Sequence, residues 1–170
     1  DSVAFAIKTP IGTVVQTGDF KIDVTPLQGE MTDLTRFGEL GREGVLALLM
    51  DSTNVERPGH SLSESKVHDR FDQLFKDCDK RIIVTTFASN VDRIRQIIDL
   101  AVKYKRKVGI TGRSMENVVK LCVELGYMKV PDGILVDMKR IGSVPRNKLV
   151  ILSTGSQGER LSLAKRQAVA

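Results

Sequence analysis

The chain has 170 residues, of which 41% are hydrophobic and 28% are charged, and its formal net charge is +5. This composition is too apolar for a disordered chain, and the longest apolar runs, such as residues 45–50, are too short to cross a membrane. We therefore expect a soluble cytoplasmic protein with one folded domain, or one domain and part of another. The basic surplus favours a polyanionic partner but does not require one.

The cysteines and the ends of the chain carry separate information. Cys78 and Cys122 are not part of a CxxC motif and have no histidine cluster near them in sequence, which predicts reduced thiols. The chain begins at Asp1, directly before a strand-like run, and ends without a clear stop signal. We expect both ends to have been cut from a longer protein.

The first 53 residues predict a small β structure. Residues 2–8 and 13–16 are β-rich and flank a Thr-Pro-Ile-Gly turn, which predicts a β-hairpin with one face on a core. Residues 21–44 are interrupted by proline and glycine, and we expect a long connection with at most one short helix. Residues 45–50 form an apolar run that predicts a further strand.

From residue 54 onward, apolar bursts alternate with amphipathic stretches. This alternation predicts an α/β fold with a doubly wound, mainly parallel sheet and helices on both faces. The predicted strands after residue 54 are 81–86, 107–111, 134–137 and 148–153. The predicted helices are 63–77, 91–104, 114–125 and 159–169. The composition shift at residues 54–60 predicts a domain junction, with one domain over 1–53 and another over 54–170.

The carboxyl ends of the predicted strands are followed by small, hydroxylic, amide or charged residues. In doubly wound sheets these ends gather at one edge, where ligands bind. Small residues, hydroxyl groups and helix N-termini suit phosphate oxygens, and Arg113 adds a cation that can bind phosphate through two bonds. The alternative is that these residues only cap helices and form turns. The candidates for phosphate contact are Ser89, Asn90, Arg113, Ser114 and Ser156.

Four further residues are of the types that ligate metal ions or carry out catalysis. Asp19 and Asp51 follow predicted strands, where a carboxylate can bridge two cations, although such aspartates are often caps or turn residues. His60 and His68 lack the spacing of metal ligands, and we expect both to be solvated. The turn at residues 154–158, TGSQG, lacks the GxGxxG spacing of a dinucleotide site.

Five ordered motifs together resemble ribonuclease J, the branch of the metallo-β-lactamase superfamily that carries a β-CASP domain. The resemblance covers about residues 1–159. The motifs are TGDFKID at 17–23, LMDSTN at 49–54, TFASN at 86–90, GRSM at 112–115 and STGSQGE at 153–159.

The resemblance implies the zinc-dependent hydrolysis of RNA by a pair of metal ions, with 5′–3′ exonuclease and endonuclease activity in RNA decay and processing. It assigns residues 1–53 to part of a metallo-β-lactamase-like sandwich and residues 54–170 to a β-CASP domain that is incomplete at its C-terminal end. Asp19 matches the aspartate that bridges the two metals, and Asp51 matches an acidic motif beside them. The resemblance also implies RNA as partner and a homo-oligomer, a dimer or tetramer.

The HxHxDH metal ligands of the family are missing from the sequence. We therefore expect the isolated chain to bind zinc poorly and to be inactive. Two other hypotheses stay open at this stage. One is a non-catalytic α/β module that binds RNA or nucleotides, and the other is a flavodoxin-like or Rossmann-like domain that binds a small molecule.

Overall fold

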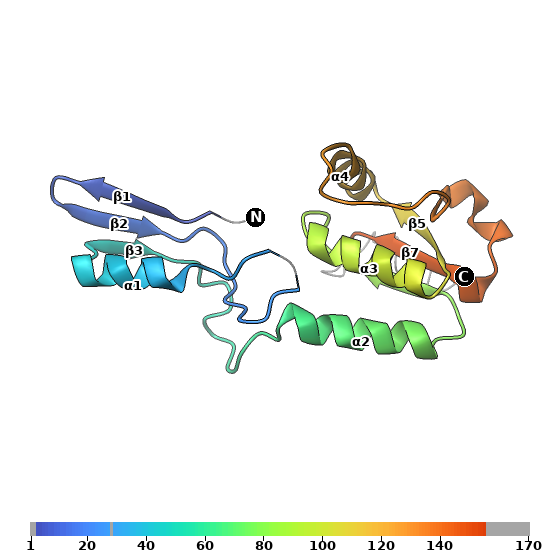
Figure 1. Ribbon diagram of the computed structural model, residues 1–170, viewed down its shortest axis with the longest axis horizontal. Helices are drawn as coiled ribbons and strands as arrows, with labels where there is room; N and C mark the ends of the chain where they lie inside the picture. Colours follow the sequence, from blue (N-terminus) through green and yellow to red (C-terminus); the bar gives the residue numbers. More distant parts are fainter. Residues whose placement is uncertain (1–2, 28, 156–170) are drawn as a thin grey trace. The chain divides into compact units, whose positions relative to one another are not determined.

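The computed structural model describes residues 3–27 and 29–155 (Figure 1). The chain divides into two compact units, the first ending at Val67 and the second beginning at His68. None of the described helices is long and apolar enough to span a membrane.

The first unit contains a three-stranded sheet with the order β1-β2-β3. Strands β1 and β2 form the predicted antiparallel hairpin, and β3 then pairs with β2 in parallel. The Thr9 hydroxyl donates a hydrogen bond to the Gly12 carbonyl across the turn, at 2.6 Å. The elements of this unit are β1 (Phe5–Thr9), β2 (Gly12–Gln16), α1 (Leu34–Glu43) and β3 (Ala47–Leu49).

The core of the first unit is small. Val15 and Leu40 are its buried hydrophobic side chains, whereas every residue of β1 and β3 is exposed. Helix α1 is the single short helix predicted between residues 21 and 44, and Asp33 caps its N-terminus by accepting a hydrogen bond from the Arg36 amide at 2.9 Å. A sheet with so little apolar surface buried gains little from the hydrophobic effect.

The second unit contains a four-stranded sheet in which every strand is parallel to its neighbours, in the order β4-β7-β5-β6. The last strand in sequence, β7, lies between β4 and β5, and all five of its residues are buried. The predicted parallel α/β architecture is therefore confirmed. Its strands are β4 (Ile82–Thr85), β5 (Lys107–Thr111), β6 (Leu135–Val136) and β7 (Leu149–Ser153).

Three helices share one core with this sheet (Figure 1). Phe75, Ile97 and Met115, one from each helix, are buried together with Val108 and Val150 of the central strands. The isoleucine spacing that predicted α3 from sequence produces this buried stripe, since residues three, four and seven apart lie on one helical face. The helices are α2 (Glu64–Asp77), α3 (Val91–Lys103) and α4 (Arg113–Glu124).

Two 3-10 helices, η1 (Met138–Ser143) and η2 (Arg146–Lys148), connect β6 to β7. Helix η1 packs against Gly109, where a Cβ atom would lie 2.9 Å from the Met138 sulfur. Neighbouring residues of a strand face opposite sides of the sheet, so η1 covers the face opposite to Val108 and the three α-helices. The sequence did not predict these short helices. The predicted helix at 159–169 lies outside the described residues.

Helices α2 and α3 are joined by a polar cluster at their surface. Asp72 accepts hydrogen bonds from Lys103 at 2.6 Å and from the Tyr104 hydroxyl at 3.0 Å. The Lys103 ammonium, assisted by the Tyr104 hydroxyl, holds the pKa of Asp72 below its ordinary value. The Asp72 carboxylate in turn raises the pKa of Lys103 through its hydrogen bond and its negative charge.

Candidate nucleic-acid interface

Asp19 and Asp51 lie just beyond the ends of two neighbouring parallel strands. In the register of β2 and β3, Gln16 is opposite Leu49, and the Thr17 amide continues the ladder by donating to the Leu49 carbonyl at 3.0 Å. The Asp51 amide donates to the Thr17 hydroxyl at 3.3 Å. The segments that carry the two aspartates are therefore in direct contact at one edge of the first sheet.

The Asp51 carboxylate is held by its own turn. Its Oδ1 atom accepts a hydrogen bond from the Thr53 hydroxyl at 2.6 Å and another from the Thr53 amide at 2.9 Å. These two bonds, with a smaller contribution from the Phe20 amide, hold the pKa of Asp51 below its ordinary value of 3.8. Like any carboxyl group with a pKa at or below 3.8, Asp51 is anionic at neutral pH.

Replacing Thr53 by valine should raise the pKa of Asp51 toward 3.8, because the substitution removes the hydroxyl donor and leaves the amide donor. Because the pKa of Asp51 is lower in the folded state than in the unfolded state, its carboxylate stabilises the fold at pH values above the unfolded pKa. This contribution is lost as the pH falls through the pKa of the folded state. The pKa of Asp51 is measured by NMR as the midpoint of the change in chemical shift of its carboxyl carbon during an acid titration. An unchanged pKa of Asp51 in Thr53→Val would show that the hydroxyl does not lower it.

The loops after the strands of the second sheet form one polar edge. Because all four strands are parallel, their carboxyl ends lie at the same edge, and the strand order makes the loops after β4, β7 and β5 neighbours. The Thr86 amide donates to the Ser153 carbonyl at 3.1 Å, which joins the first two loops. Gly112, with φ of 108°, lies so near Thr154 that a Cβ atom there would be 3.2 Å from the threonine hydroxyl. The three loops therefore converge.

The predicted phosphate contacts in these loops differ in how they are engaged. The Asn90 side chain caps α3 by accepting a hydrogen bond from the Arg93 amide at 3.1 Å, which is the alternative foreseen from sequence. Ser89 is exposed, and Arg113 and Ser114 are exposed in the first turn of α4, where amides and the positive end of the helix dipole favour an anion. Ser156 lies outside the described residues.

The described residues do not build a zinc site. No group of three or more His, Cys, Asp or Glu side chains that could hold a metal ion exists within residues 3–27 and 29–155. Asp19 and Asp51 supply carboxylates, but zinc in proteins is held by three or four ligands. A metal site at this edge would need ligands from other parts of a longer protein.

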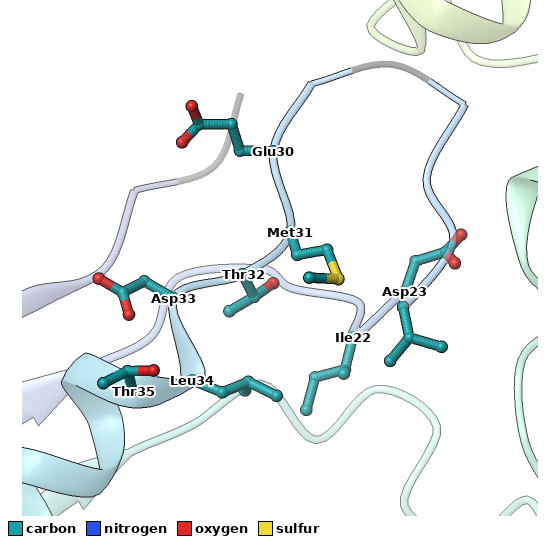
Figure 2. Close-up of a pocket in the computed structure, with 9 residues that line it drawn as sticks. Ile22, Asp23, Glu30, Met31, Thr32, Asp33, Leu34 and Thr35 are labelled. Carbon is teal, nitrogen blue, oxygen red and sulfur yellow. The ribbon is translucent and has the colours of Figure 1, made fainter.

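The first unit also contains a pocket that is separate from Asp19 and Asp51. It has a volume of about 400 Å³ and is lined by residues 22–24 and 30–35. Figure 2 shows the apolar side chains of Ile22, Met31 and Leu34 around its centre, whereas the Glu30 and Asp33 carboxylates point away from it. Neither Asp19 nor Asp51 lines this pocket, and we assign no chemistry to it.

Comparisons with known proteins identify the family. The sequence profile described as "Ribonuclease J, beta-CASP domain" matches residues 79–170. The chain belongs to the ribonuclease J β-CASP family. The match includes the loops after β4, β5 and β7, so the ribonuclease J resemblance noted from the motifs is confirmed.

Curated ribonuclease J proteins are similar to nearly the whole chain. Ribonuclease J of Synechocystis is 48% identical over 166 residues, which are 98% of this chain and 26% of that protein. Ribonuclease J of Thermus thermophilus is 44% identical over 168 residues, 99% of this chain and 29% of that protein. Ribonuclease J2 of Bacillus subtilis is 38% identical over 99% of this chain and 30% of that protein. The chain thus spans roughly a quarter to a third of the length of these relatives.

A solved structure resembles the fold. The crystal structure of a protein of unknown function from Enterococcus faecalis superimposes with a TM-score of 0.60, covering 88% of this chain and 37% of that one, at 16% sequence identity. At this identity the likeness supports the fold alone.

Sequence reasoning missed the two threonines that organise the first edge. Thr17 and Thr53 hold Asp51 through hydrogen bonds to its amide and its carboxylate. The spacing of Thr53 two residues after Asp51 is the signal that could have found one of them, because an aspartate commonly accepts hydrogen bonds two residues downstream.

Proposed function

We propose that the chain is part of a metal-dependent ribonuclease that hydrolyses RNA phosphodiester bonds, by 5′–3′ exonuclease and endonuclease action in RNA decay and processing. In this proposal the second unit supplies contacts to the RNA backbone and the first unit supplies carboxylates to the hydrolytic site. The isolated chain is inactive, because the remaining metal ligands come from outside these 170 residues.

One observation carries the proposal: the polar loops after β4, β5 and β7 converge at one edge of a parallel sheet in a chain of the ribonuclease J β-CASP family. A row of hydroxyl groups, amides and one arginine offers hydrogen bonds to successive phosphate oxygens and carries no acidic residue to repel them. Ser89, Arg113, Ser114 and Ser156 are the proposed phosphate contacts. Asn90 contributes by fixing the start of α3.

The two aspartates have different proposed roles. Asp19 is proposed as a ligand of the zinc pair, which would supply an activated hydroxide and neutralise charge on the phosphate. Asp51 is proposed to lie beside that site as a negative charge whose carboxylate is held in place by two hydrogen bonds from Thr53. Both roles require the ligands that the described residues do not supply.

A cleavage assay with the full-length protein that contains these residues tests the proposal. Labelled RNA with a 5′-monophosphate should be shortened by the full-length protein, and removal of metal by a chelator should abolish the reaction until zinc is restored. The 170-residue chain at the same concentration should leave the RNA intact.

Two results would count against this function. Cleavage that persists at full rate after metal removal would contradict a metal-dependent hydrolysis. RNA that binds to the full-length protein but is never cleaved would favour the other hypothesis, a non-catalytic RNA-binding α/β module. No group of three or more His, Cys, Asp or Glu side chains that could hold a metal lies within residues 3–27 and 29–155, and this observation keeps the second function open.

A further inference from the structure

Lysines and arginines are concentrated at the starts of three strands of the second unit. Residues 80–81, 105–107 and 146–148 lie at or just before the starts of β4, β5 and β7, and they contain seven lysines and arginines and no acidic residue. The whole chain has a formal surplus of +5. The nearest acidic residues in sequence are Asp77 and Asp79, at the end of α2 and just after it.

Strand order brings these three segments together. The strands run β4-β7-β5, and Ile82 is opposite Val150 while Lys107 is opposite Leu149, so the three strands start at nearly the same level. Adjacent strands lie about 5 Å apart. Because the strands are parallel, this basic edge is opposite to the edge formed by the polar loops.

A buried arginine fixes the arrangement. Arg106 is 4% exposed and donates to the Lys80 carbonyl at 2.8 Å and to the Cys78 carbonyl, which ties the start of β5 to the approach of β4. Lys107 is also engaged, through its hydrogen bond to the Gly133 carbonyl. Lys105 has φ of 53°, a conformation uncommon for lysine, so the turn before β5 is held in a defined form.

Three lysines of this edge are available to a partner. Lys80, Lys105 and Lys148 are exposed, and none of them takes part in an ion pair with another residue of the described part of the chain. By contrast, residues 86–90, 112–114 and 154–155 at the opposite edge contain a single cation, Arg113.

We propose that the basic edge formed by Lys80, Lys105 and Lys148 binds the sugar-phosphate backbone of single-stranded RNA. Exposed lysines fit a phosphate chain better than a protein, because protein interfaces are poor in lysine and rich in aromatic side chains. The identity of the polyanion rests on the proposed function. The edge would hold a part of the RNA distant from the strand-end loops and add to affinity without reading sequence.

RNA binding by the 170-residue chain tests the proposal without any cleavage. Fluorescence anisotropy with a labelled single strand of about 16 nucleotides, the upper site size of a small binding domain, is measured over roughly 50 to 200 mM salt. The triple variant Lys80→Gln, Lys105→Asn, Lys148→Gln should lower affinity about 10- to 100-fold at the lowest salt. Its salt slope should fall by about two units, since each lost contact with a single strand lowers it by about 0.7. Asparagine is chosen at residue 105 because it tolerates the positive φ.

A matched variant controls for net charge. Lys8→Gln, Lys66→Gln, Lys120→Gln removes the same charge from exposed residues that are not part of the three basic segments, and it should retain affinity within about threefold. Arg113→Gln separately measures the polar-loop edge and should lower the slope by less than one unit. If the triple variant does not fold, Lys80→Gln with Lys148→Gln replaces it, since both side chains are exposed outside regular strands.

Three outcomes would overturn the proposal. They are absence of RNA binding by the unsubstituted chain, an equal loss in the matched variant, and competition by polyglutamate as strong as competition by unlabelled RNA. The last would assign the edge to an acidic protein. None of these bears on cleavage by the full-length protein, which is measured separately, so a failure here is distinct from a failure of the proposed function.

Discussion

Replacing Asp19 by asparagine is expected to lower RNA cleavage by the full-length protein about a thousandfold. Asparagine has the same shape but no charge, so it cannot balance two cations as a carboxylate can. The loss of roughly 4 kcal/mol of transition-state stabilisation corresponds to three powers of ten in rate. The rate of release of labelled nucleotide under saturating RNA measures the effect.

The fold should survive this substitution. Asp19 is exposed, and its carboxylate has no hydrogen bond or ion pair to another residue of the described segments, so the expected change in stability is within about 0.5 kcal/mol. Asp33→Asn is the matched control, because Asp33 lies in the same unit and asparagine can keep its capping bond to the Arg36 amide. Equal rates for Asp19→Asn and Asp33→Asn would remove Asp19 from the hydrolytic site.

The alternation of strands and helices was predictable because its cause is local. Within the predicted strands 107–111 and 148–153, residues 108–111 and 149–153 are buried or half-buried on both faces of a parallel sheet, and the spacing of Ile94, Ile97 and Ile98 forms the buried side of α3. Parallel strands alone place the loops after β4 and β5 at the same edge of the sheet. Those parts of the fold depend on residues close together in sequence.

The order of the strands was not predictable, and the basic edge depends on it. Strand β7 is last in sequence but lies between β4 and β5. Only this insertion places Lys148 between Lys80 and Lys105. The phosphate contacts predicted from sequence lie at the carboxyl ends of the strands, where doubly wound sheets bind ligands. The lysines of the basic edge lie at the amino ends.

Local signals also failed where packing outweighs them. Gly38 and Gly41 lie inside α1 although glycine disfavours helices by roughly 1 kcal/mol each relative to alanine, and Leu40 between them is buried. Residues 138–148 form two 3-10 helices around Pro145, too short to give a periodic pattern. The roles of Asp19, Asp51 and the strand-end polar residues stay predictions, since they depend on ligands and RNA.

The second large effect is expected at Arg106. Arg106→Met should lower the free energy of unfolding of the second unit by about 3 to 6 kcal/mol, since a hydrogen bond from a charged group contributes about 1.5 to 3 kcal/mol and two are lost. The guanidinium is buried and donates to the carbonyls of Lys80 and Cys78, just after the C-terminus of α2. A cation at this end of a helix also interacts favourably with the helix dipole. Methionine fills similar space but leaves both carbonyls without this donor.

Urea unfolding followed by tyrosine fluorescence measures this loss in the second unit alone, because both tyrosines, Tyr104 and Tyr127, lie there and the chain has no tryptophan. Arg140→Met, at an exposed site on η1, is the matched control and should change stability by no more than about 0.5 kcal/mol. Arg106→Lys should fall between the two, because a single ammonium keeps the charge but lacks the planar fork that reaches both carbonyls. If Arg106→Met unfolds at the same urea concentration as Arg140→Met, the buried guanidinium does not hold the start of β5 against the approach of β4, and the basic edge would lack its fixed geometry.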